Sequence, residues 1–475
     1  MLSLTSTLAR FAHGLTLEAI PAELREQIKL HLVDALACGL ASTRSPLAAA
    51  FQAHCAEEYA AGPCRLLGTS LSLGPVGAAL YNGMAINALD HDDGFEVDGR
   101  GMGHPGASLV AAALVGVWQR KTSGRALLEA LVAAYEINAR VIIAVQPSIE
   151  RFRQVYGVCQ HQALGAAIAY GKLALEDADG LENALGLAGT LTPLPSLRKY
   201  NWEARPLVSF KDFTAPAAEA GVRAVRLHQH QWVGARAVLD GDQGLWRMLG
   251  SDRFDSDALL AGLGSEWLGA NASLKHYPAC RWIHTALESF EQVQQAQGLD
   301  AAAIREIRVL TGTTQARDFM DRRPANEVDA QFSLPHTLAC LALGIAKQDW
   351  HTAATINAPQ VRALADRVVA VIDPALDAAM SETRRPAGQV LVELASGTLS
   401  GPRLDYPLGC RERPLSRAQV AEKFRQYAPL GGRAEQVETV LAGLLALEQC
   451  EDVGALLEEL WPAAILSQSR CSAKL

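Results

Sequence analysis

Residues 87–108 organise the chain, and they read Asn-Ala-Leu-Asp-His-Asp-Asp-Gly-Phe-Glu-Val-Asp-Gly-Arg-Gly-Met-Gly-His-Pro-Gly-Ala-Ser. An Ala- and Gly-rich run precedes this stretch at residues 74–88 and another follows at 107–118, and both runs are typical of buried helices. The connection between them carries seven acidic or imidazole side chains: Asp90, His91, Asp92, Asp93, Glu96, Asp98 and His104. A connection this long and acidic between buried helices favours a functional loop over a plain connector.

The two ends of this loop predict an acid/base pair. If the first helix continues to about Asp90, then Asn87, Asp90 and His91 share one helical face. Pro105 suits the first position of the next helix, so His104 is expected to be its N-cap residue. Because a helix N-terminus disfavours imidazolium, His104 should be neutral and able to accept a proton. Asp90 and His104 are therefore the candidate acid and base.

Two other interpretations of the loop compete with this one. Asp92, Asp93, Glu96 and Asp98 could form an ordinary solvated acidic loop. A calcium loop would need Gly at its sixth position and Glu at its twelfth; counted from Asp90, Gly94 comes one place early and Gly101 closes the loop. His91 and His104 are too far apart for a zinc-binding helix pair, and we expect no structural metal.

Composition excludes several classes of protein. The 475 residues are enough for two or three domains, and a chain that is 49% hydrophobic but only 6% aromatic must have an aliphatic core, which suits closely packed helices. A net charge of −8 argues against partners such as nucleic acid or an anionic membrane surface.

The cysteines and the N-terminus indicate a cytoplasmic location. Nine scattered cysteines without a Cys-x-x-Cys pair fit buried thiols in a reducing compartment. The N-terminus lacks the blocks of a signal peptide, and the longest apolar helix candidates, residues 107–118 and 126–145, are too short or too charged to span a membrane. We therefore expect a soluble cytoplasmic protein.

The pattern along the chain divides it into three parts. Residues 1–272 are dominated by helical periodicity, including 21–42, 45–59, 71–88, 105–120, 124–145, 161–175, 181–191 and 214–228. Within residues 273–408, strand-like alternation at 304–311 and a hairpin pattern at 389–405 flank helices at 336–346 and 360–369. Helical patterns return within 409–475. The predicted fold is mainly α, an all-helical bundle built from both chain ends, with an inserted α+β lid.

A second polar cluster lies where the helical pattern gives way to a mixed pattern of helices and strands. It reads Lys275-His276-Tyr277-Pro278-Ala279-Cys280-Arg281-Trp282-Ile283-His284. Domain interfaces are favoured ligand sites, and Lys275 and Arg281 are suited to binding carboxylates. A solvated basic turn is the alternative, although Trp282 and Cys280 favour burial. Lys211, between Phe210 and Phe213, either extends from the core to solvent or is held in a pocket. His161 and His336 read as core or capping histidines.

These clusters together resemble the MmgE/PrpD family. The resemblance is carried by Leu-Asp-His-Asp-Asp-Gly followed by His-Pro-Gly, by Lys211 and the small-residue helix after it, and by Lys-x-Tyr-Pro-Ala-Cys-Arg-x-x-His. Ala330–His336 and the Pro-Leu-Ser pattern at Pro414–Phe424 also match, so the resemblance covers nearly the whole chain in order.

The resemblance implies a large helical domain made from both chain ends, a smaller α+β lid, a homodimer, and neither metal nor organic cofactor. It places Asp90, His104, Lys211 and Lys275 in the catalytic site. It aligns Cys280 with a histidine of the decarboxylases, and the chain departs from them at Gly94, where they carry Thr, and at Tyr156, where they carry His. The side chains expected to contact the substrate are His91, Asp93, Cys280, Arg281 and His284.

The expected activity is that of a cofactor-independent lyase, most simply a hydro-lyase of the 2-methylcitrate dehydratase kind, acting on a small di- or tricarboxylate by α-proton abstraction. The alternatives are an epimerase of a dicarboxylate such as iminodisuccinate, a decarboxylase of the cis-aconitate type, and a protein that binds a carboxylate without converting it. Lys275 lies in the predicted lid and Asp90 in the helical part, so lid closure is expected to complete the site.

Overall fold

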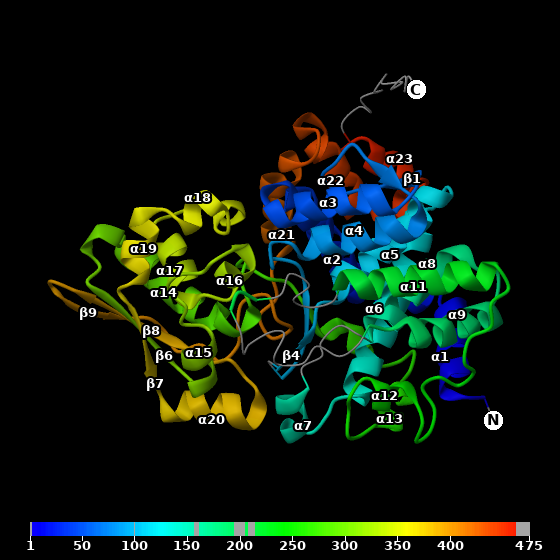
Figure 1. Ribbon diagram of the computed structural model, residues 1–475, viewed down its shortest axis with the longest axis horizontal. Coiled ribbons are helices and arrows are strands. Elements are labelled where there is room, and N and C mark those ends of the chain that lie inside the picture. The colour runs from blue at the N-terminus through cyan, green and yellow to red at the C-terminus, as the bar shows by residue number, and fades with distance from the viewer. Residues whose placement is uncertain (1, 99, 156–160, 194–204, 208–213, 462–475) are drawn as a thin grey trace, which may run out of the picture.

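The computed structural model describes residues 2–98, 100–155, 161–193, 205–207 and 214–461. A helical body lies beside a smaller α+β unit, as Figure 1 shows. The body contains the helices α1 Leu4–Gly14, α2 Ala22–Ala41, α3 Pro46–Glu58, α4 Pro75–Asn87, α5 Pro105–Gln119, α6 Gly124–Ala144, α7 Ile149–Gln154, α8 Gln162–Ala174, α9 Ala178–Leu191, α11 Thr214–Gln229, α12 Leu245–Met248, α13 Ser256–Leu260, α21 Arg417–Tyr427, α22 Val437–Leu445 and α23 Val453–Glu458.

Both ends of the chain contribute to the core of the body. Leu36 of α2 and Phe424 of α21 belong to the same buried cluster, although they are far apart in sequence. Ser416 starts α21 with a reciprocal capping box to Gln419, which satisfies backbone donors at the helix start. The predicted mainly α fold with both chain ends in one bundle is confirmed.

Small residues let these helices pack closely. A Cβ atom added to Gly221 of α11 would lie only 2.5 Å from the Cβ of Ala166 in α8, so a larger residue there would push the helices apart. The Ala- and Gly-rich composition of the first part of the chain thus has a packing reason.

The body is not free of strands, which corrects the all-helical prediction in detail. A two-stranded sheet joins β1 Ala61–Arg65 to β2 Ser72–Leu73, and the loop after α4 forms a three-stranded sheet of order β4-β3-β5. Its strands are β3 Gly94–Val97, β4 Arg100–Gly103 and β5 Ala272–Ser273. The last of these brings the chain that leads to Lys275 directly against the acidic loop.

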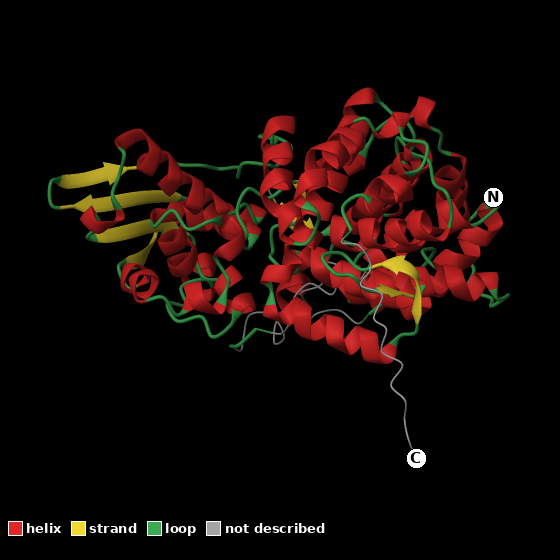
Figure 2. Ribbon diagram, turned by 90° about the horizontal axis from the view of Figure 1, so that it is seen from above, coloured by secondary structure: helices red, strands yellow, loops and turns green. Residues whose placement is uncertain are grey.

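The α+β unit is built on a four-stranded sheet of order β7-β6-β8-β9, in which β6 and β7 are parallel and the other pairs antiparallel. Figure 2 shows this sheet at the end of the molecule away from the body. The elements are β6 Glu306–Thr311, β7 Val368–Ile372, β8 Gln389–Leu394, β9 Gly397–Ser400, α14 His284–Gln297, α15 Thr313–Asp318, α16 Glu327–Gln331, α17 Leu334–Ala342, α18 Ala353–Ile356, α19 Pro359–Ala365 and α20 Pro374–Thr383. The helix predicted at 360–369 ends at Ala365, because Val368–Ile372 joins the sheet as β7.

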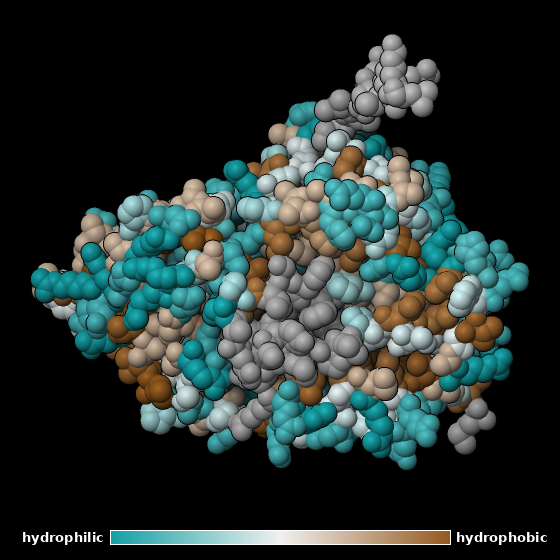
Figure 3. All heavy atoms as spheres, in the orientation of Figure 1, coloured by the Kyte–Doolittle hydropathy of each residue, from teal (hydrophilic) through white to brown (hydrophobic). Residues whose placement is uncertain are grey.

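The α+β unit has its own hydrophobic core, in which Ile307 and Val390 from the sheet lie in one cluster with Phe290 and Leu338 from the helices. The boundaries predicted at 272/273 and 408/409 remain a prediction. No helix in the described part of the chain combines the length and apolar character needed to cross a membrane. On the face drawn in Figure 3, polar residues predominate over the α+β unit, and apolar ones gather over the body near α11.

Candidate active site

The acidic loop is buried and folded, which excludes the solvated alternative for most of its acids. Asp90, Asp92, Asp93 and Glu96 are each at most 4% exposed, whereas Asp98 at the hairpin turn is exposed. Buried carboxylates are found where they are paired or hydrogen-bonded, so each of these four must have a structural or chemical reason to be there.

Asp90 does not extend helix α4, contrary to the prediction of one helical face for Asn87, Asp90 and His91. The helix ends at Asn87, and Asp90 has a left-handed backbone with φ of 52°. Lys275 holds this conformation: its Nζ lies 2.9 Å from Asp90 Oδ1 and 3.1 Å from the Asp90 carbonyl oxygen. Both side chains are 1% exposed, so each charge depends on the other for compensation.

His104 is the N-cap residue of α5 with Pro105 at the first helical position, as predicted, although its side chain caps no helical N–H. Its Nδ1 lies 2.9 Å from the backbone carbonyl oxygen of Asp93. A carbonyl oxygen can only accept, so Nδ1 carries a proton and Nε2 is the ring nitrogen that this contact leaves unused.

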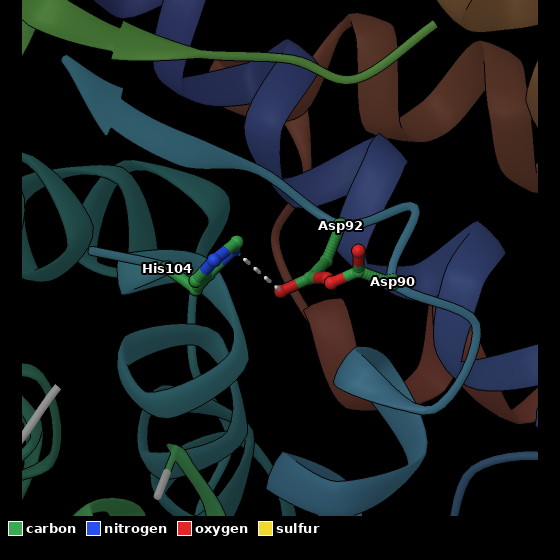
Figure 4. A group of neighbouring side chains, drawn as sticks. All are labelled: Asp90, Asp92 and His104. Carbon is green, nitrogen blue, oxygen red and sulfur yellow. Dashed lines mark ion pairs between the residues drawn. The ribbon is translucent and has the colours of Figure 1, made fainter. Parts of the chain in front are cut away.

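Figure 4 shows His104 facing the carboxylates of Asp90 and Asp92 across the loop. His104 Nδ1 lies 3.9 Å from Asp92 Oδ2. The amide of Asn87 orients Asp92 by donating to both carboxylate oxygens at 3.1 Å. One atom from each of Asp90, Asp92 and His104 lies within 4.8 Å of the others, so these three could surround a cation. The Lys275 ammonium already supplies a positive charge to Asp90.

Asp93 supports the loop from behind. Its carboxylate accepts from the backbone N–H of Gly106 at 2.7 Å and from the Tyr135 hydroxyl at 2.7 Å, and it lies 3.0 Å from His31 Nδ1. Burial, and then the neighbouring Asp93 charge, raise the pKa of Tyr135 well above its usual value, so this hydroxyl stays a donor. These contacts fit Asp93 to positioning His104 better than to touching a substrate.

Arg281 forms the other wall of the site. Its Nε donates to Glu96 of strand β3, and its Nη1 donates to the carbonyl oxygens of Leu274 at 3.3 Å and Leu408 at 3.1 Å. His284 Nε2 lies 3.0 Å from the Ala279 carbonyl oxygen. Burial, followed by the charge of Arg281, lowers the pKa of His284 well below its usual value, so His284 is a neutral support beside Arg281.

His91 points away from this wall, toward the C-terminal helices. Its Nδ1 lies 2.8 Å from the Tyr427 hydroxyl, and its carbonyl oxygen accepts from Lys423 Nζ at 2.5 Å. Burial, and then the charge of Lys423, lower the pKa of His91 well below its usual value. His91 thus anchors the loop to α21.

A pocket opens between the hairpin and the start of the α+β unit, with an empty volume of about 390 Å³ that includes its mouth. The described lining residues are Gly94, Phe95, Glu96, Met102, Gly103, His104, Lys275, Cys280, Arg281 and Trp282. The acidic loop and the segment from Lys275 to His284, which were predicted as two separate clusters, therefore face one cavity.

Two family models, described as the MmgE/PrpD N-terminal domain and the MmgE/PrpD C-terminal domain, match residues 6–256 and 277–447. The chain belongs to the MmgE/PrpD family. Cis-aconitate decarboxylase from Aspergillus terreus is 25% identical, over 96% of this chain and 95% of the relative. The cis-aconitate decarboxylase of Homo sapiens is 24% identical over 96% and 94%, and the cis-aconitate decarboxylase-like protein oryM of Aspergillus oryzae is 24% identical over 96% of both chains.

In this MmgE/PrpD member, the structure brings together four of the predicted site residues around the pocket, namely His104, Lys275, Cys280 and Arg281, with Asp90 held by Lys275. His91, Asp93 and His284 lie behind them. Lys211 and Tyr156 lie outside the described residues. Their assignment stays a prediction.

The structure adds two residues that the sequence interpretation of this MmgE/PrpD chain did not select. Glu96 lines the pocket from strand β3, and the only sequence signal for it is its place among the acids of the loop. Gln162, at the start of α8, clamps the backbone of His104: its Oε1 accepts from the His104 N–H at 3.2 Å and its Nε2 donates to the His104 carbonyl oxygen at 2.8 Å. Nothing in the local sequence pattern indicates that contact, because it joins residues 58 apart.

Proposed function

We propose that this protein is a cofactor-independent lyase that removes the α-proton of a small di- or tricarboxylate, most simply as a hydro-lyase. The observation that carries the proposal is the pocket that combines His104, whose Nδ1 is held by a backbone carbonyl oxygen, with the buried cations Lys275 and Arg281. Membership of a family whose relatives include enzymes named cis-aconitate decarboxylase supports a carboxylate substrate.

Removal of a proton next to a carboxylate is difficult because negative charge develops beside negative charge. In the proposed reaction His104 Nε2 takes the α-proton, and the electron pair moves into the adjacent carboxylate. The cations Lys275 and Arg281 stabilise the resulting charge, since fixed positive groups in a buried site need no reorganisation during the reaction. The electron pair then returns as the β-hydroxide leaves with a proton, for which the Asp90–Lys275 pair is the candidate donor.

The experiment is a turnover assay of the purified full-length protein with citrate-like and malate-like hydroxy acids, followed by the ultraviolet absorbance of the new alkene. Product formation that His104→Gln abolishes is the expected result. Absence of any alkene from all of these acids would rule out the hydro-lyase and leave the two related reactions below.

Decarboxylation of cis-aconitate is the second candidate, favoured by the names of the relatives. It uses the same charge stabilisation but releases carbon dioxide, so labelled carbon dioxide from cis-aconitate distinguishes it. An epimerase of a dicarboxylate such as iminodisuccinate would return the proton to the opposite face. Solvent deuterium entering recovered substrate, without alkene, would identify that reaction.

The proposal also includes a homodimer and closure of the α+β unit over the substrate. The buried ion pair between Lys275 and Asp90, which joins the two predicted parts of the chain, supports the closure. Light scattering of the purified protein tests the dimer. Small-angle scattering with and without a bound carboxylate tests the closure.

A further inference from the structure

Two residues that line the pocket each carry a buried polar atom that has no hydrogen-bond partner in the described part of the chain: Nη2 of Arg281 and Oε2 of Glu96. The two side chains are 6% and 4% exposed. A buried donor or acceptor without a partner costs about 1–3 kcal/mol, so such atoms call for an occupant. One of these atoms can only donate, and the other, in the ionised carboxylate, can only accept.

The rest of both side chains is firmly held, which fixes where the two unused atoms lie. Glu96 Oε1 accepts from the Ser273 hydroxyl at 2.8 Å and also from Arg281 Nε. Arg281 Nη1 is occupied by backbone carbonyl oxygens. Nη2 lies on the same edge of the guanidinium as Nε, and Oε2 belongs to the same carboxylate as Oε1, so both unused atoms lie beside one ion pair.

Gly94 leaves room for this arrangement. A side chain at Gly94 would begin 3.0 Å from Ser273 Oγ and 3.6 Å from Glu96 Oε1, which is close enough to disturb the hydroxyl that orients the carboxylate. The position where the chain departs from the decarboxylase pattern is therefore next to the Glu96–Ser273 contact.

We infer that Glu96 and Arg281 bind a hydroxyl group of the substrate, and that the pocket selects hydroxy acids over carboxylates that lack one. A hydroxyl donates to Glu96 Oε2 and accepts from Arg281 Nη2, which satisfies both atoms with one group. A carboxylate placed there would meet Arg281 but be repelled by Glu96, and a methylene would leave both atoms unpaired. This inference rests on the proposed function for its substrate class and names Glu96 as the specificity-determining residue.

Two matched ligand pairs test the inference by calorimetry on the full-length protein. Citrate differs from propane-1,2,3-tricarboxylate only by a hydroxyl, and malate differs from succinate in the same way. We expect the hydroxy acid of at least one pair to bind about 10- to 100-fold more tightly, as for a hydrogen bond to a charged group. Equal affinities in both pairs, or no binding of either hydroxy acid at millimolar concentration, would overturn the inference.

Glu96→Gln then locates the effect. The amide keeps the size of the side chain but presents a donor where Oε2 accepts, so the preference for the hydroxy acid should fall toward unity while the deoxy acid binds as well or better. Asp98→Asn removes a charge from the same hairpin at an exposed position and should leave the preference intact. A preference that persists in Glu96→Gln, with the protein shown to be folded by its thermal transition, would sink the assignment of Glu96.

These measurements separate the inference from the proposed function. Selective binding of a hydroxy acid without turnover of any acid would uphold the inference and remove the hydro-lyase. Turnover without selectivity between the members of either pair would uphold the lyase and remove the role of Glu96.

Discussion

The Nδ1 atom of His104 lies 2.9 Å from the carbonyl oxygen of Asp93. This contact occupies Nδ1 and leaves Nε2 as the nitrogen for the proposed reaction. The same Asp93 holds the start of α5 by accepting from the Gly106 N–H. One residue therefore sets both the position and the tautomer of the proposed base.

His104→Gln should lower kcat by about 10²- to 10⁴-fold, the usual contribution of a general base, and leave KM nearly unchanged. The reason is that in the proposed reaction His104 takes the proton and does not bind the substrate carboxylates. Steady-state kinetics on the accepted acid measure both constants. His230→Gln, at an exposed position, is the matched control, and equal kcat in the two variants would contradict the assignment.

Gln162→Met should slow turnover without weakening substrate binding, because it removes the amide that clamps the His104 backbone. The His104 N–H and carbonyl oxygen would lose that partner, which should also cost about 1–3 kcal/mol of the free energy of unfolding. The test is a pH profile of kcat: a repositioned base shifts the profile, whereas general destabilisation only lowers the amount of folded enzyme. An unchanged profile and kcat would show that the clamp is dispensable.

Lys275→Met should raise KM and lower kcat together, because Lys275 lines the pocket and pairs with Asp90. It should also destabilise the fold by about 3–5 kcal/mol, since Asp90 would be left buried without its cation. Denaturant unfolding measures this loss. Adding Asp90→Asn to Lys275→Met should recover much of the stability but none of the activity. If Lys275→Met alone were as stable and as active as the wild type, the buried ion pair would have no role.

His161→Leu should make the protein more resistant to acid. Burial lowers the pKa of His161 from 6.5 to about 3, so below pH 6.5 the unfolded state binds a proton that the folded state does not. Stability is therefore lost as the pH falls from about 6.5 toward 3, and removal of the imidazole removes this contribution. Unfolding free energies between pH 7 and 4 should fall less steeply in the variant, and parallel curves would mean that His161 titrates normally.

The sequence predicted the features that depend on local pattern. Pro105 and His104 placed the start of α5 correctly, and alternation placed β6 and the β8–β9 hairpin. It failed where tertiary contacts decide. The turn at Asp90 is held by Lys275, 185 residues away, and β3 became a strand by pairing with β5, which also lies in a distant part of the chain. The helix predicted at 360–369 overlaps β7, because Val368–Ile372 pairs in parallel with β6.

The site residues follow the same division. Acidic residues in a long loop pointed to Asp90 and His104, but which of the loop acids face the pocket depends on the hairpin register. Glu96 faces the pocket whereas Asp93 is turned toward Tyr135 and His31, and no spacing rule separates the two.

The contact of Lys423 with the loop has a consequence for synthesis of the chain. Lys423 Nζ lies 2.6 Å from Asp34 Oδ1, a partner 389 residues earlier, and also donates to the carbonyl oxygen of His91. Until α21 has emerged from the ribosome, Asp34 lacks this cation and the acidic loop lacks its contact with Lys423. A nascent or proteolytically shortened chain can therefore contain every described residue of the pocket and still lack the contact that holds the loop in place.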